Sequence, residues 1–181
     1  MDARLRDTLA AIDAVNAEDP NRLVVRGEER PKALGEAELA TDWVTQLVPE
    51  PSAALLLAVR AHHLRRWTIP RSTYPDGRAG YLRWRRDLHD VHADDVAVIM
   101  GEHGWDDATV TRVQDIIRKR GLGRINDAEL QAFEDALCLV FIETQYDALA
   151  GRLADETMTN VVDKTLKKMS AQGQALAATL R

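Results

Sequence analysis

The sequence contains a single cysteine, few aromatic residues and no long apolar run. One cysteine, Cys138, cannot form an internal disulfide, and its free thiol suits a reducing compartment. Aromatic residues make up 5% of the 181 residues. No apolar stretch approaches the roughly 18 residues that predict a membrane span, and Met1–Ala11 carries charges that a signal peptide would lack. These absences predict a cytoplasmic protein with no membrane partner.

An excess of positive charge is also absent. The chain has 24 Lys and Arg against 29 Asp and Glu, giving a formal net charge of −5. This balance makes nucleic acid an unlikely partner, although it permits a local basic pocket. Hydrophobic residues form 45% of the chain, which is enough for one domain over residues 1–181 with a proper core.

No alternating strand pattern of useful length occurs, whereas apolar residues recur at helical spacing along most of the chain. We therefore predict an all-α, compact single-domain helical bundle. The residues at Leu23–Gly27 could be extended, but no obvious pairing partner follows. Leu55–Val59 is apolar on every side, as in a fully buried helix, and that helix is expected to continue to Ile69-Pro70. The other helices are expected near residues 5–16, 31–47, 81–100, 107–120 and 128–150, with a last segment carrying Val161 to Met169.

Polar residues interrupt the two most apolar helices, and this coincidence predicts a site. His62 and His63 follow the first apolar run, and Glu134-Asp135 precedes the second, Ala136–Ile142. His89 and His92 are three apart and share a helical face. Imidazole nitrogens with carboxylate oxygens suit a divalent transition-type metal, for which we predict His63, His92 and Asp135 as ligands. The alternative is a charge-paired polar core, in which Glu134 only favours the start of its helix through the dipole.

Arginines gather close to the histidines. They include Arg66 and Arg78, whose guanidinium groups suit a carboxylate or phosphate, so an anionic small-molecule substrate is expected. Tyr81 could line the same pocket, although a tyrosine three residues before Trp84 could simply pack against it. The arginines could equally pair with nearby aspartates, namely Asp76, Asp87 and Asp90.

Several segments resemble an uncharacterised family known as the domain of unknown function 4202. They are Ala61-His62-His63-Leu64-Arg65-Arg66-Trp67, Tyr74-Pro75, Gly77-Arg78-Ala79-Gly80-Tyr81, Trp84-Arg85 and Glu134-Asp135-Ala136-Leu137-Cys138-Leu139-Val140-Phe141. More distantly, the order of these parts resembles HD-type metal-dependent phosphohydrolases. That resemblance implies Glu38 in place of the first histidine ligand, His62-His63 in place of the His-Asp pair, and His92 and Asp135 as further ligands. The signature His-Asp dipeptide itself is absent.

Two functions of different classes follow. The first is an HD-like hydrolase acting on a phosphorylated small molecule or nucleotide, with a divalent metal of unspecified identity as cofactor. In it, Arg66, Arg78 and Tyr81 bind the substrate, and Glu134 or Glu38 completes the ligand set or acts as general base. The second is a non-catalytic helical module that binds an anionic ligand or a protein partner. The sequence predicts neither the substrate nor the oligomeric state.

Overall fold

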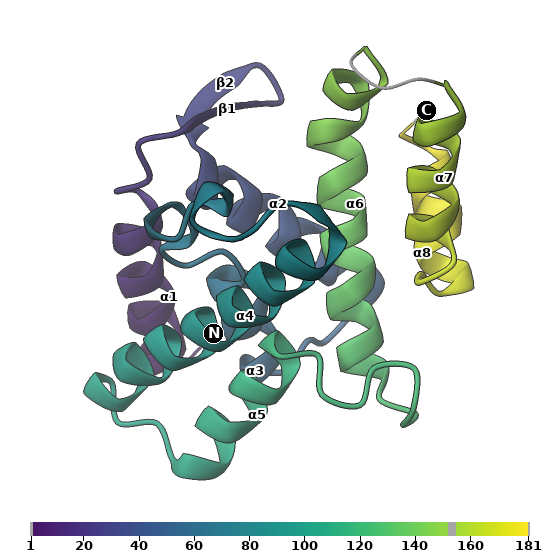
Figure 1. The fold of residues 1–181 in the computed structure, drawn as a ribbon. Coiled ribbons are helices and arrows are strands. Elements are labelled where there is room, and N and C mark those ends of the chain that lie inside the picture. Colours follow the sequence, from purple (N-terminus) through teal and green to yellow (C-terminus); the bar gives the residue numbers. More distant parts are fainter. Residues whose placement is uncertain (1, 152–154, 181) are drawn as a thin grey trace.

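The computed structural model describes residues 2–151 and 155–180, and over these residues the fold is all-α (Figure 1). The described helices are α1 (Ala3–Asn16), α2 (Lys32–Leu47), α3 (Ala53–Ala61), α4 (Gly77–Glu102), α5 (Asp107–Ile117), α6 (Ala128–Ala150), α7 (Asp155–Leu166) and α8 (Ala171–Ala178). Two 3-10 turns, η1 (Arg66–Thr68) and η2 (Arg71–Thr73), connect α3 to α4. The prediction of an all-α fold is confirmed. Among the described helices, none has the length and apolarity that crossing a bilayer requires.

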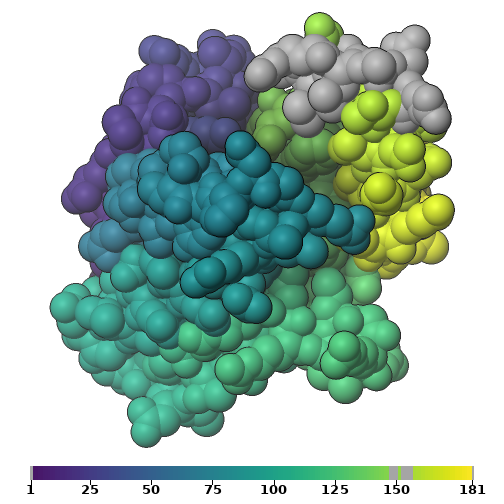
Figure 2. All heavy atoms as spheres, in the orientation of Figure 1, coloured from purple at the N-terminus to yellow at the C-terminus, as the bar shows by residue number. Residues whose placement is uncertain are grey.

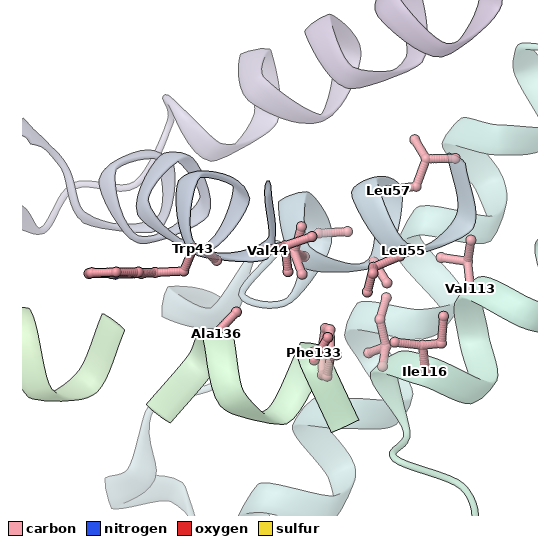
Figure 3. Packing of buried hydrophobic residues seen from close by; sticks show 14 of the residues in the cluster. Trp43, Val44, Leu55, Leu57, Val113, Ile116, Phe133 and Ala136 are labelled. Atoms are coloured by element: carbon pink, nitrogen blue, oxygen red, sulfur yellow. The ribbon is translucent and has the colours of Figure 1, made fainter. Parts of the chain in front are cut away.

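Helix α3 lies at the centre of the core, as its apolar sequence predicts. Leu55 and Leu57–Val59 have no solvent exposure. Helices α1, α2, α5 and α6 pack around it. Figure 3 shows the layers that meet there: Trp43 and Val44 from α2, Val113 and Ile116 from α5, and Phe133 and Ala136 from α6. Burying large aliphatic and aromatic side chains on all sides of one short helix fixes the helices that carry the polar residues described below.

The end of α3 differs from the sequence prediction. The helix begins where expected, with the Ser52 hydroxyl accepting a hydrogen bond from the amide of Leu55 at 3.1 Å. It ends at Ala61 rather than near Ile69-Pro70. The chain then turns, because Leu64 is fully buried and Arg65 adopts a left-handed conformation with φ of 52°. His62 and His63 therefore lie in the turn after the helix and not on a helix that continues to Ile69-Pro70.

A hairpin precedes α2. Strand β1 (Arg22–Val25) pairs antiparallel with β2 (Glu28–Pro31) through a two-residue turn in which Arg26 and Gly27 have φ of 49° and 90°. Positive φ at both turn positions matches the twist of paired strands. The partner strand escaped prediction because Glu28–Pro31 is charged rather than alternating in hydrophobicity.

The last third of the chain forms a helical layer of its own. Helices α7 and α8 lie beside α6 (Figure 1). The sequence predicted one helical segment through Met169, but α7 ends at Leu166 and Ser170 begins α8, where its hydroxyl accepts from the amide of Gly173 at 3.1 Å.

Two glycines of α4 give a matched test of the close approach between this helix and the loop before it. A Cβ at Gly80 would lie 1.9 Å from the carbonyl oxygen of Pro75, whereas one at Gly101 would meet nothing within 4 Å. We expect Gly80→Ala to lower the free energy of unfolding by about 3 kcal/mol, since backbone must move. Gly101→Ala should raise it by about 0.5–1 kcal/mol through helix propensity. Urea unfolding measures both, and equal effects would contradict the packing at Gly80.

Candidate functional site

A cavity of about 810 Å³ lies between α4, α6 and α7, and the turn after α3 reaches its wall. Figure 2 shows this face of the molecule hollowed between the teal surface at the beginning of α4 and the yellow-green surface of α7. Two buried histidines and two buried acids open onto it, His62, His92, Glu36 and Glu134, together with the partly exposed His63 and His89. Its size is in the range of small-molecule sites.

One carboxylate and two imidazoles converge at the inner wall of this cavity. Ligand-type atoms of Glu36, His62 and His63 all lie within 4.8 Å of one another. His63 Nδ1 is 2.6 Å from Oε2 of Glu36, to which it donates its hydrogen. The ring of His92 is close behind, with its centroid 6.1 Å from that of His63. Nitrogen and oxygen donors in this combination suit a borderline divalent ion such as zinc.

Backbone carbonyls fix the tautomers of two of these histidines. His62 Nδ1 donates to the carbonyl of Val59 at 2.6 Å, and His92 Nδ1 donates to the carbonyl of Leu64 at 2.7 Å. A carbonyl only accepts, so Nε2 of each ring carries the lone pair. Nε2 of His92 is buried and has no hydrogen-bond partner within the described part of the chain. Metal-binding histidines usually donate the other ring nitrogen to a carbonyl or carboxylate, as all three do here.

The electrostatics keep these imidazoles neutral. Burial lowers the pKa of His62 and of His92 to about 3, and it lowers the pKa of His89 on the same cavity wall to about 4. Burial, with the charge of Arg66 nearby, holds the pKa of His63 well below its usual value. Neutral imidazole is the form that ligates a metal. These imidazoles are therefore neutral at pH 7 without a metal to displace a proton.

Glu36 is the site residue that sequence reasoning missed, and the pattern of α2 could have revealed it. Its neighbours at helical spacing, Ala33 and Ala40, are buried, and Glu36 shares their apolar face with 1% exposure. Burial raises the pKa of this carboxyl group, and the charge of Lys32 works in the opposite direction. Glu38, which the sequence suggested, points to a different side of the helix because two residues turn an α-helix by about 200°. Its oxygen lies 3.3 Å from an Arg30 guanidinium nitrogen, and Glu38 is not among the residues that line the cavity.

Glu134 does face the cavity. It shares one face of α6 with Leu137, Cys138 and Phe141, all of which line the same wall. Its carboxylate is hydrogen-bonded to Lys119. Burial acts to raise the pKa of Glu134, but the charge and hydrogen bond of Lys119, with the charges of Lys168 and Arg85, together lower it. Lys119 adopts a left-handed conformation with φ of 56° in the turn after α5. Strained non-glycine residues of this kind cluster at functional sites.

Asp135 is not brought to the histidines. Asp135 follows Glu134 directly in α6, so its side chain points about 100° away from that of Glu134 and faces α8. Its Oδ1 accepts hydrogen bonds from Gln131 Nε2 and from the amide of Ser170, both at 2.9 Å. A Cβ at Gly173 would approach its carboxyl carbon to 2.8 Å. The sequence predicted that the Asp135 carboxylate binds a metal. The carboxylate instead accepts its hydrogen bonds from Gln131 and from the beginning of α8.

This placement predicts a purely structural effect of Asp135. We expect Asp135→Ala to lower the free energy of unfolding by about 2–3 kcal/mol, because it removes several buried hydrogen bonds at the start of α8. Metal content per folded chain should not change. Urea unfolding and elemental analysis of the folded protein measure the two quantities, and loss of bound metal with unchanged stability would contradict the assignment.

The cavity concentrates positive charge. Arg66, Arg78 and Tyr81, predicted as substrate-binding residues, all line it. Among the described residues, the cationic side chains that line it are Arg66, Arg78, Arg85, Lys119, Lys164, Lys167 and Lys168, and the acidic ones are Glu36 and Glu134. Arg66 stacks over the Trp84 ring at 4.6 Å. The alternative, that the arginines near the histidines pair with aspartates, holds for two of them, because Asp87 pairs with Arg83 and Arg86. Asp90 pairs instead with Arg118, and neither Arg66 nor Arg78 forms an ion pair within the described residues.

Together, the fold and the site define an all-α protein with a buried histidine and carboxylate cluster at the bottom of a basic cavity. The chain belongs to the family described as a domain of unknown function, DUF4202, whose family model matches residues 6–181. Neither the search of curated proteins nor that of solved structures found a match. The resemblance to HD-type phosphohydrolases therefore stays a prediction from sequence.

Proposed function

We propose that this protein is a metal-dependent hydrolase that acts on a phosphorylated small molecule. The observation that supports it most is the convergence of Glu36, His62 and His63 within 4.8 Å at a cavity that also holds the unpartnered Nε2 of His92. A buried imidazole nitrogen without a partner is costly unless it serves a ligand. We assign Glu36, His62, His63 and His92 as the residues that would hold a divalent ion.

The proposed ligand set differs in part from the one implied by HD-type enzymes. His62, His63 and His92 are retained, Glu36 replaces Glu38, and Asp135 drops out because it is hydrogen-bonded to Gln131 and Ser170. The proposal rests on the donors of this chain and not on the resemblance. A metal here would supply Lewis acidity and a water of lowered pKa.

The remaining cavity residues take the other steps of hydrolysis. Glu134, the cavity acid outside the ligand set, would accept the proton of the attacking water; its low pKa leaves it ionised at neutral pH. Lys119 holds that carboxylate in place by a hydrogen bond. Arg66, at the cavity wall with no ion-pair partner among the described residues, would bind the phosphate oxygens. The water oxygen bonds to phosphorus, the bond to the leaving oxygen breaks, and the leaving oxygen takes a proton.

The test is elemental analysis of protein purified without added metal, with a panel of phosphomonoesters and phosphodiesters. We expect about one transition-metal ion per chain, and chelation should remove metal and hydrolysis together. Protein that binds no metal from a set of divalent ions, and hydrolyses nothing in their presence, would overturn the proposal. In that case the rival function, a non-catalytic anion-binding module, predicts stabilisation by ligand that chelators leave unchanged.

A further inference from the structure

The charge that lines the cavity exceeds what one phosphate group needs. Of the described residues that line it, seven are cationic and two are acidic, although the chain as a whole carries a net charge of −5. The histidines add no charge at neutral pH because burial keeps them neutral. A single phosphomonoester carries at most two negative charges, so it would leave most of this positive charge uncompensated in a confined space.

The cationic groups also come from two separate walls. Arg66, Arg78 and Arg85 belong to η1 and α4, whereas Lys164, Lys167 and Lys168 belong to α7 and the turn after it. Figure 1 shows α4 and α7 on different sides of α6. The positive charge is therefore presented from two directions across one cavity.

These six side chains form no ion pair within the described part of the chain. The neighbouring Arg83 and Arg86, in contrast, both pair with Asp87. Lys164, Lys167 and Lys168 are exposed on the cavity side of α7. Like charges on one short segment repel each other, and an anion between them would relieve that repulsion.

We infer that the cavity binds a substrate with at least two phosphate groups, of which one lies at the η1 and α4 arginines beside the histidines and another at the lysines of α7. Between these groups, Leu82, Phe141 and Val161 offer apolar wall to the uncharged part of the molecule. The inference rests on the proposed function for the reaction, but the binding that it states does not require metal.

The experiment measures anion binding by isothermal titration calorimetry, in excess EDTA and at fixed ionic strength. Inorganic phosphate, pyrophosphate and tripolyphosphate are the probes. We expect tripolyphosphate to bind at least about tenfold more tightly than phosphate, since only the longer anion can engage both walls. Equal affinities for the two would overturn the inference.

Two triple variants test the location. The first is Lys164→Gln, Lys167→Gln and Lys168→Gln; these lysines are exposed and unpaired, so the fold should persist. The second removes three exposed arginines that do not line the cavity, Arg6→Gln, Arg22→Gln and Arg124→Gln. We expect the lysine variant alone to weaken tripolyphosphate binding by about tenfold or more, with phosphate affinity nearly unchanged. Unchanged tripolyphosphate binding, or equal losses in both variants, would refute a second phosphate site. Failure of the hydrolase proposal would show instead as absent metal and absent turnover, with the anion affinities intact.

Discussion

Glu36→Gln is expected to lower divalent-metal affinity by at least about tenfold and to reduce any metal-dependent hydrolysis by about a hundredfold or more. Glutamine keeps the size of the side chain and an oxygen that can accept from His63 Nδ1, 2.6 Å away in the native protein. The negative charge is what is lost. Metal affinity is measured by competition with a chromophoric chelator, and hydrolysis with whichever phosphoester the protein turns over.

The stability of the same variant separates a functional carboxylate from a structural one. Glu36 is 1% exposed, and burial raises its pKa, so the ionised form of this carboxyl is disfavoured in the metal-free protein. We expect metal-free Glu36→Gln to unfold at the same urea concentration as the native protein or at a higher one. Loss of function with retained stability is typical of a residue kept for its chemistry.

Glu38→Gln is the matched control on the same helix. Glu38 pairs with Arg30 near the surface and does not line the cavity, so metal affinity and hydrolysis should be unchanged. If both variants lost metal equally, the convergence of ligands at Glu36 would not be the metal site.

This pair of glutamates also shows what the sequence could and could not predict. The helix over residues 32–47 was predictable from its apolar spacing, and Glu36 lies within that spacing between Ala33 and Ala40. The choice of Glu38 came from the order of parts in a distant family. A local rule, that an acid on the apolar face of a helix is a buried acid, would have selected Glu36.

The histidines were harder to place. A helix through residues 53–67 fits the composition of that stretch, since Leu and Arg are strong helix formers and a His costs less than about 0.7 kcal/mol relative to Ala. What ends α3 is the burial of Leu64 and the left-handed Arg65, and both depend on neighbouring helices. Sequence patterns therefore selected His63 and His92 but not their geometry.

Glu134 and Asp135 also show that the sequence pattern selects residues without giving the direction in which their side chains point. Adjacent acids point about 100° apart on a helix, so only one can face a given cavity. Which one does so is decided by how α6 is rotated against α4, α7 and α8. That rotation follows from packing of Phe133 and Ala136 into the core (Figure 3), and not from the acids themselves.

The metal-free protein is expected to lose stability steeply below about pH 6.5. His62 and His92 have pKa values of about 3 in the folded protein against about 6.5 in an unfolded chain. Below pH 6.5 the unfolded chain binds more protons than the folded protein, so the free energy of unfolding falls as pH falls. Between pH 7.5 and pH 5 each of these two residues should lower the free energy of unfolding by about 2 kcal/mol, or by roughly 4 kcal/mol together. Urea unfolding at these two pH values measures the total change, to which the lowered pKa values of His63 and His89 add and from which the raised pKa of Glu36 subtracts.

Two variants make that expectation specific. His92→Gln removes one titrating ring and should reduce the loss between pH 7.5 and pH 5 by about 2 kcal/mol, whatever it does to stability at pH 7.5. Gly80→Ala lowers stability through a backbone clash that does not depend on protonation, so it should lower the free energy of unfolding equally at pH 7.5 and pH 5. A divalent metal should steepen the loss, because protons compete with it for the same Nε2 lone pairs. If the native protein had equal stability at pH 7.5 and pH 5, these imidazoles would not be buried and neutral, and the proposed donor set would lose its physical basis.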